Sequence, residues 1–165
     1  MDLPLFLLNR HPAARLAAEE LARYLHMIGQ ASCCVETRER YDRAEPVGLW
    51  LGVGDDLPVV DLPVVDDLAV DDAIAIRVDG LRGAIAGNNP RSLLIATYRY
   101  LQALGCRWVR PGATGEYLPA VALEKASVHV REAASYRYRA LDLAGALSYE
   151  YLLETIAWGP KIGLN

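Results

Sequence analysis

The sequence predicts an α+β fold in which a mixed β-sheet carries two long helices on one face. Short apolar segments bounded by turn residues recur through residues 1–133 and indicate strands. Two longer segments, 13–28 and 90–104, place apolar side chains at helical spacing. A hairpin connection at 79–83 joins two neighbouring strands, so part of the sheet is expected to be antiparallel. The apolar helix faces then need this sheet to bury them.

The beginning of the chain contributes three predicted strands and the first helix. The strands are apolar runs at 3–8, 33–38 and 47–53. A polar turn after the first strand leads into the helix 13–28, which Gly29 is expected to close. The helix residues that recur at spacings of three and four are Leu16, Ala17, Glu20, Leu21, Tyr24, Leu25 and Ile28.

An acidic segment separates these elements from the hairpin. Residues 55–72 hold seven aspartates, no lysine or arginine, and a tandem repeat, LPVVD, at 57–61 and 62–66. Clustered carboxylates suit a calcium ion, but the D-x-D-x-D-G spacing of a calcium loop is absent. A solvated acidic loop is the favoured interpretation, and it would be the most mobile part of the domain. The hairpin strands follow at 72–78 and 83–86.

The strongest local signals lie in residues 85–119. Asn89 is predicted to cap a helix that begins at Pro90, and Gly105 stands where a left-handed C-cap is needed. The apolar face of this helix consists of Leu93, Leu94, Thr97, Tyr98, Leu101 and Leu104. Residues 106–109 are predicted to form a strand, which makes the whole stretch a βαβ-like unit.

Residues 88–119, NNPRSLLIATYRYLQALGCRWVRPGATGEYLP, also resemble a known kind of domain. They are similar to the small α/β domain that precedes the catalytic barrel in some glycoside hydrolases. The resemblance is to the N-terminal domain of α-glucuronidases and, more distantly, to the second domain of β-N-acetylhexosaminidases. It implies a hexosaminidase domain 2-like fold and an accessory role, with bond cleavage taking place elsewhere in the parent enzyme.

The chain is expected to divide into an accessory α/β domain, 1–133, and a second unit, 134–165. A strand at 128–130 closes the first domain. In the second unit, 138–143 is predicted to be a strand, a helix with Leu152, Leu153, Ile156 and Ala157 on its apolar face follows, and the last residues resemble the beginning of another strand. This unit resembles the first βα unit of the catalytic (β/α)₈ barrel in the same hydrolases.

The second resemblance implies that Arg139 and Asp142 contact substrate, although Ala140 stands where the family has glycine. One βα unit cannot close a barrel, which needs about 250 residues. Glycoside hydrolysis normally uses two carboxylates, and the resemblance places them on later strands. We therefore expect a truncated barrel with no catalytic residues, and a fragment that is inactive by itself. Its expected partners are the rest of the barrel and, in the parent enzyme, carbohydrate.

Composition excludes several other classes of function. A net charge of −4 argues against a nucleic-acid surface, and no apolar run approaches the roughly 20 residues of a membrane span. The three histidines have no metal-ligand spacing, and no cofactor motif is present. Cys33, Cys34 and Cys106 form no disulfide framework and are interpreted as buried, reduced thiols. With no signal peptide, these thiols favour a cytoplasmic location without deciding the compartment.

Several residues carry two interpretations. The asparagines Asn88 and Asn89 together with Arg91 either bind an anion at a helix N-terminus or, as we favour, form the turn and cap with a solvated arginine. Glu116 and Tyr117 either shape an interdomain surface or belong to a structural loop, which is favoured. The three tryptophans, Trp50, Trp108 and Trp158, suit sugar stacking or, as we favour, core packing.

Three hypotheses of different classes remain. The preferred one is a non-catalytic N-terminal domain of an α-glucuronidase-like or N-acetylhexosaminidase-like hydrolase. The second is a stand-alone carbohydrate-binding module, which would need exposed aromatic side chains. The third is an oligomerisation module, because residues 136–165 carry apolar surface that would favour a homo-oligomer.

Overall fold

The computed structural model describes residues 2–143 and 148–165. Six of its strands form one mixed sheet in the order β2-β1-β3-β5-β4-β8. The strands are β1 (Asp2–Leu7), β2 (Ser32–Thr37), β3 (Gly48–Val53), β4 (Ala73–Asp79), β5 (Arg82–Gly87) and β8 (Ser127–Ala133). The first three strands and β5 run parallel, whereas β4 is antiparallel to both of its neighbours. The predicted mixed sheet is confirmed, and its hairpin lies inside the sheet rather than at an edge.

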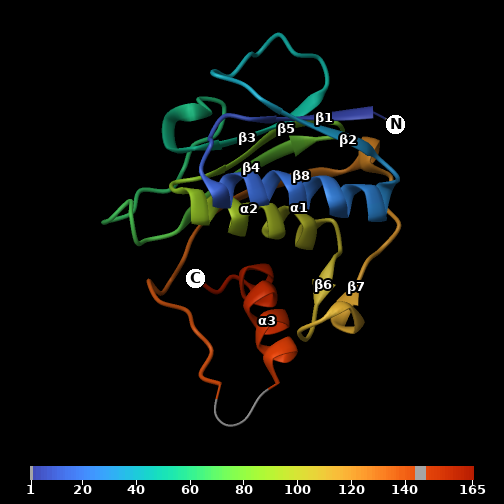
Figure 1. Cartoon of the computed structure of the whole chain (residues 1–165). Helices are drawn as coiled ribbons and strands as arrows, with labels where there is room; N and C mark the ends of the chain where they lie inside the picture. The colour runs from blue at the N-terminus through green and yellow to red at the C-terminus, as the bar shows by residue number, and fades with distance from the viewer. Residues whose placement is uncertain (1, 144–147) are drawn as a thin grey trace.

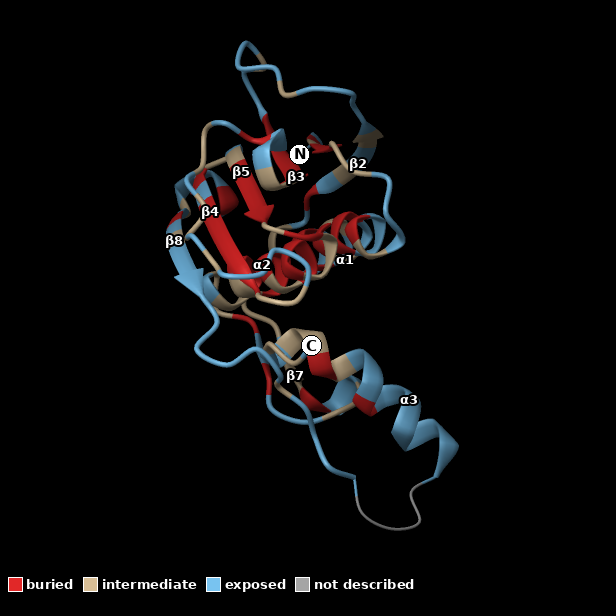
Figure 2. Ribbon diagram, turned by 90° about the vertical axis from the view of Figure 1, so that its left-hand side faces the viewer, coloured by how far each residue is buried: buried red, intermediate tan, exposed pale blue. Residues whose placement is uncertain are grey.

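The two long helices, α1 (Pro12–Gly29) and α2 (Pro90–Ala103), lie side by side on one face of the sheet (Figures 1 and 2). The predicted cap of α2 is confirmed, because the Asn89 side chain accepts a hydrogen bond from the Ser92 N–H at 2.9 Å. Gly105 has a φ of +106°, as the left-handed position after α2 requires. At the end of α1, however, Gln30 rather than Gly29 is left-handed, with a φ of 52°.

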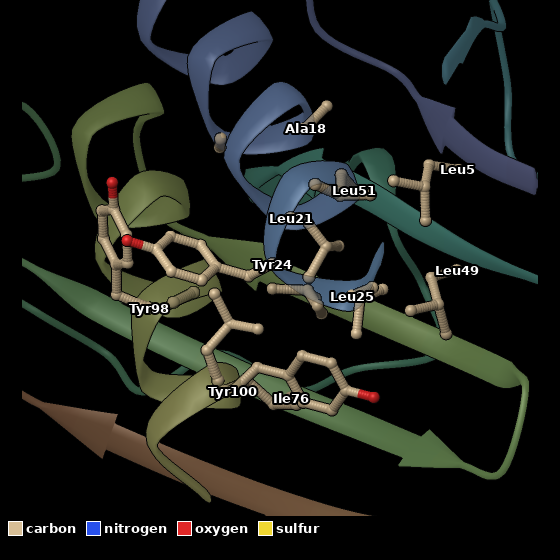
Figure 3. Packing of buried hydrophobic residues seen from close by; sticks show 14 of the residues in the cluster. Leu5, Ala18, Leu21, Tyr24, Leu25, Leu49, Leu51, Ile76, Tyr98 and Tyr100 are labelled. Atoms are coloured by element: carbon tan, nitrogen blue, oxygen red, sulfur yellow. The ribbon is translucent and has the colours of Figure 1, made fainter. Parts of the chain in front are cut away.

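The main core lies between the helices and the sheet. Figure 3 shows side chains of α1 and α2 meeting those of β1, β3 and β4 in this layer. Its largest fully buried members include Tyr24, Tyr100, Leu3, Leu5, Leu21, Leu25, Leu49, Leu51, Ile85 and Leu93. Leu16, which the helical spacing placed with them, is instead exposed, because the apolar face of α1 is narrower than the spacing suggested.

A second, smaller core covers the opposite face of the sheet. Phe6, Trp50 and Leu57 are buried there with Ala84 and Ala86, and the residues packed against them are Leu8, Tyr41, Val59, Val60 and Leu62. The first LPVVD repeat therefore packs its apolar side chains on the sheet, which corrects the prediction of a solvated loop. The prediction holds better for the second repeat, where Val64 is 96% exposed. The two repeats differ because Leu57, Val59 and Val60 of the first lie on the second core, whereas the second contributes only Leu62.

The strand predicted at 106–109 does not join the main sheet. Its central part, β6 (Arg107–Trp108), pairs with β7 (Glu116–Tyr117) in a separate two-stranded ribbon. The expected βαβ-like unit is thus wrong, since β3 and β4 already occupy both sides of β5. The ribbon leaves the end of α2 and lies beside the helix layer, away from the sheet (Figure 1).

The C-terminal segment, which we define as the described residues of 134–165, lies below the helices, so that α1 and α2 separate it from the sheet (Figures 1 and 2). Its helix, α3 (Tyr149–Trp158), is confirmed. The predicted strand at 138–143 is not formed, because this stretch has no neighbouring strand to pair with in the described part of the chain. A 3₁₀ turn at Gly159–Ile162 replaces the expected beginning of another strand. Residues 144–147, in the loop predicted before α3, are outside the described residues.

Candidate functional site

Arg139 and Asp142, the two predicted substrate-binding residues, have different surroundings. The Arg139 guanidinium is mostly buried and donates hydrogen bonds to Asp72 at 2.5 Å and to the carbonyls of Gly163 and Tyr136 at 2.6 Å. Asp142 is exposed on the surface. Arg139 therefore attaches the C-terminal segment to the first domain in this structure, while the substrate role of both residues stays a prediction.

Asp72 is the centre of this attachment. Its side chain is 2% exposed and accepts hydrogen bonds from four groups. Ser92 Oγ and Arg91 Nε donate to one carboxylate oxygen at 2.6 and 3.0 Å. Arg139 and Asn165 Nδ2 donate to the other, the latter at 3.0 Å. We call these five residues the Asp72 cluster.

The Asp72 cluster joins three parts of the chain that are far apart in sequence. Asp72 ends the acidic segment, whereas Arg91 and Ser92 belong to the first turn of α2. Arg139 and Asn165 come from the C-terminal segment.

The side-chain amides of Asn88 and Asn89 donate to the backbone carbonyls of Leu68 and Asp71, which fixes the end of the acidic segment against the first turn of α2. The turn-and-cap interpretation is thus confirmed for the asparagines. Arg91, expected to be solvated, instead pairs with a buried carboxylate.

The four donors decide the charge of Asp72. Burial alone would disfavour ionisation, but the hydrogen bonds from Ser92, Arg139 and Arg91 outweigh it and lower the pKa of the Asp72 carboxyl. Asp71 forms an ion pair with Arg137 at 2.6 Å, and this bond lowers the pKa of Asp71 as well. The end of the acidic segment therefore binds arginines of the C-terminal segment.

A second cluster of polar groups attaches the 3₁₀ turn that follows α3 in the C-terminal segment. The Glu116 carboxylate accepts hydrogen bonds from Tyr24 Oη at 2.6 Å and from Lys161 Nζ at 2.7 Å. Trp108 Nε1 donates to the same Tyr24 oxygen at 3.0 Å. Despite burial, the bonds from Lys161 and Tyr24 lower the pKa of Glu116, and the pair raises the pKa of Lys161. Glu116 is thus at a contact between the two parts of the chain, whereas Tyr117 is exposed.

Helix α3 presents most of its apolar side chains to solvent. Thr155 is buried, and its hydroxyl donates to the Tyr151 carbonyl at 2.7 Å. The exposed residues are Tyr149, Tyr151, Leu152, Leu153 and Ile156, the last with 64% of its surface accessible. Figure 2 shows this helix as exposed along most of its length. Four of them, Tyr149, Leu152, Leu153 and Ile156, share one side of the helix, and we call these four the α3 apolar face. Among the described helices, α3 exposes the largest group of apolar residues.

The carboxyl groups of the described residues show one common direction of pKa shift. A general acid in a glycosidase needs a raised carboxyl pKa. Among the described residues, every carboxyl group with a resolved shift has a lowered pKa: Glu20, Asp71, Asp72, Asp79, Glu116 and Glu150. The described residues also contain no group of three potential metal ligands.

The tryptophans and cysteines behave largely as packing residues. Trp50 and Trp108 are buried, which confirms core packing for both, and Trp158 is half-buried with its Nε1 donating to the Trp108 carbonyl at 2.8 Å. Burial raises the pKa of the Cys33 and Cys106 thiols to about 11, which makes them unreactive. Cys34, predicted to be buried, is exposed, because β2 is an edge strand with one uncovered face.

No protein-family model and no curated protein matches this chain. Among the helices that the structure describes, none combines the length and hydrophobicity needed to cross a membrane. Sequence reasoning missed Asp72, Lys161 and Asn165 as attachment residues. The sequence placed Asp72 only at the beginning of a predicted strand. Nothing in it paired Asp72 with Arg139 or Asn165, which lie 67 and 93 positions further along the chain.

Proposed function

We propose that this chain is a non-catalytic accessory domain of a glycoside hydrolase of the α-glucuronidase or N-acetylhexosaminidase kind, joined to the beginning of the catalytic barrel. The accessory domain is residues 1–133, with its mixed sheet and two-helix layer. The C-terminal segment is the first βα unit of the barrel. Its partner is the remainder of that barrel, and carbohydrate is the substrate of the parent enzyme.

The observation that carries this proposal is the α3 apolar face. In a (β/α)₈ barrel each helix covers the strands with its apolar face, and each strand pairs with two neighbours. Here the stretch 138–143 forms no strand and has no strand partner in the described part of the chain, and α3 exposes large apolar side chains. Both features fit a unit whose neighbours in the barrel would supply the strand pairing and cover the helix.

The attachment clusters support the same proposal. The Asp72 cluster holds Arg139 and Asn165 of the C-terminal segment on the first domain, and Glu116 holds Lys161. An accessory domain of this kind would position the barrel through these contacts. In them, charged side chains of the first domain pair with charged side chains of the C-terminal segment. The lowered pKa values of Asp72 and Glu116 favour this structural role.

Hydrolysis of aryl glycosides tests the proposal. We expect this 165-residue chain to cleave neither an aryl glucuronide nor an aryl N-acetylglucosaminide, whereas the longer product of the same gene should cleave one of them. Cleavage by the 165-residue chain would contradict the proposal, and so would a gene whose product ends at Asn165. In the first case Glu116 and Asp142 would need to be tested as a catalytic pair.

A second candidate function is oligomerisation, which the same α3 apolar face favours. A second copy of the chain could cover this face, so we expect the isolated chain to self-associate as its concentration rises. In sedimentation velocity experiments, Ile156→Asp should weaken association. Leu16→Asp is the matched control, because Leu16 is an exposed leucine on α1. A chain that stays monomeric at all concentrations would exclude oligomerisation.

The longer gene product distinguishes the two candidates. If the barrel covers α3, the longer product should be monomeric while the shorter chain self-associates. If oligomerisation is the function, both should associate, and Ile156→Asp should weaken association of both. Stand-alone carbohydrate binding through Trp50 or Trp108 finds less support, because both side chains are buried and offer no exposed ring to a sugar.

A further inference from the structure

A pocket of about 550 Å³ opens on the face of the sheet that α1 and α2 leave free. Arg77 and Asp79 of β4 line it together with Arg82 and Ala84 of β5. Trp50 of β3 and Arg43, from the loop before β3, complete its wall. We call this site the arginine pocket. Its residues Trp50 and Ala84 belong to the second core, on the face of the sheet opposite the helices. The C-terminal segment lies beyond the helices (Figure 1), so the pocket is independent of the proposed attachment to a barrel.

The strand register forms the floor and walls of the pocket. In one row across the sheet, Trp50 is opposite Ala84, and Ala84 is opposite Arg77. In the next row, Arg82 is opposite Asp79. The small Ala84 therefore lies between two long side chains and is itself buried at the edge of the second core. The guanidinium of Arg82 donates to the Arg43 carbonyl at 2.6 Å, which holds the loop at the rim.

The pocket is positive although the whole protein is negative. Three arginines line it against one carboxylate, Asp79, in a chain of net charge −4. Asp79 is occupied elsewhere, because Ser127 Oγ donates to it at 2.6 Å and His129 Nε2 lies 3.0 Å away. Arg43, Arg77 and Arg82 form no ion pair with any carboxylate that the structure describes.

We propose that the arginine pocket binds a small organic anion through its carboxylate or phosphate group. Guanidinium groups match these oxyanions because they present two parallel N–H donors. Arg77 and Arg82 come from paired strands and lie on the same face of the sheet, so one oxyanion would contact both guanidinium groups. The pocket volume falls within the range of ordinary small-ligand sites.

Isothermal titration calorimetry at low ionic strength tests this assignment, with inorganic phosphate, glucose 6-phosphate, glucuronate and glucose as probes. We expect saturable binding of at least one anion and none of glucose. Binding of glucuronate would identify a carboxylate ligand, and binding of glucose 6-phosphate a phosphate ligand. Added salt should weaken the binding, because the pocket is open to solvent.

Arg77→Gln should lower the affinity for the bound anion by roughly tenfold or more, since a hydrogen bond to a charged group is lost. Arg15→Gln is the matched control, because Arg15 is an exposed arginine of α1 and the change in net charge is the same. Circular dichroism checks that both variants fold. The assignment is wrong if no anion binds saturably at millimolar concentration, if glucose binds equally well, or if Arg15→Gln weakens binding as much as Arg77→Gln.

Discussion

Replacing Asp72 by alanine is expected to lower the free energy of unfolding by about 3–5 kcal/mol, because the partners of a buried carboxylate are left without it. Arg139, which is mostly buried, loses its ion pair, and Ser92 and Asn165 lose hydrogen bonds. Since two of these donors belong to the C-terminal segment, this segment should detach from the helix layer. Urea unfolding measures the loss of stability. Limited trypsin digestion at Arg137 and Arg139 measures how far the C-terminal segment has detached.

Asp61→Ala is the matched control for this prediction. Asp61 is another aspartate of the acidic segment that pairs with an arginine, Arg131, but its side chain is 87% exposed. Exposed pairs contribute little to stability, so this variant should unfold and digest as the wild type does. Equal losses in the two variants would show that the Asp72 cluster does not hold the segment.

Asp72 should also make stability depend on pH. Its pKa in the folded state is below the ordinary value, so the stabilisation is complete above the pKa of the unfolded chain, about 3.9. It is lost as the pH falls through the lower, folded-state pKa. The difference in unfolding free energy between wild type and Asp72→Asn should therefore be constant near neutral pH and shrink in acid. A difference that grew with acidification would contradict the ionised state of Asp72.

Replacing Trp108 by alanine is expected to lower the free energy of unfolding by about 3–5 kcal/mol. It would leave a large cavity at the centre of the aromatic cluster, which consists of Tyr24, Tyr98 and Trp108. Trp108 is 4% exposed and packs edge-to-face on Tyr24 and Tyr98, with ring centroids 5.2 and 5.4 Å away. Its indole N–H donates to Tyr24 Oη, which in turn donates to Glu116. Removing the indole should therefore also weaken the contact between Glu116 and Lys161.

Trp108→Phe separates packing from hydrogen bonding. It keeps an aromatic ring and removes the indole N–H, so it should cost only about 1–2 kcal/mol. Trp158→Ala, at a half-buried position, should cost less than Trp108→Ala. Urea unfolding followed by far-UV circular dichroism compares the three variants without relying on tryptophan fluorescence. Equal losses in all three would mean that Trp108 is not at the centre of the cluster.

The exposed α3 helix shows where patterns of apolar spacing reach their limit. The spacing of Leu152, Leu153 and Ile156 correctly predicted a helix with an apolar face. It could not show whether anything covers that face, because a helix has the same periodicity whether its apolar side is buried or exposed. The strand predicted at 138–143 is wrong for a related reason, since a strand forms only where a neighbour supplies its hydrogen bonds.

The sequence by itself determined the local elements of this protein. Apolar spacing, the Asn89 cap and Gly105 located both long helices, and turn residues located the strands of the sheet, because these signals act between residues close in the chain. Only the tertiary structure decided that Asp72 meets Arg139 and Asn165, that Glu116 meets Lys161, and that Arg43, Arg77 and Arg82 share a pocket. Such contacts depend on strand order and on the path of loops, and no periodic pattern of side chains records either.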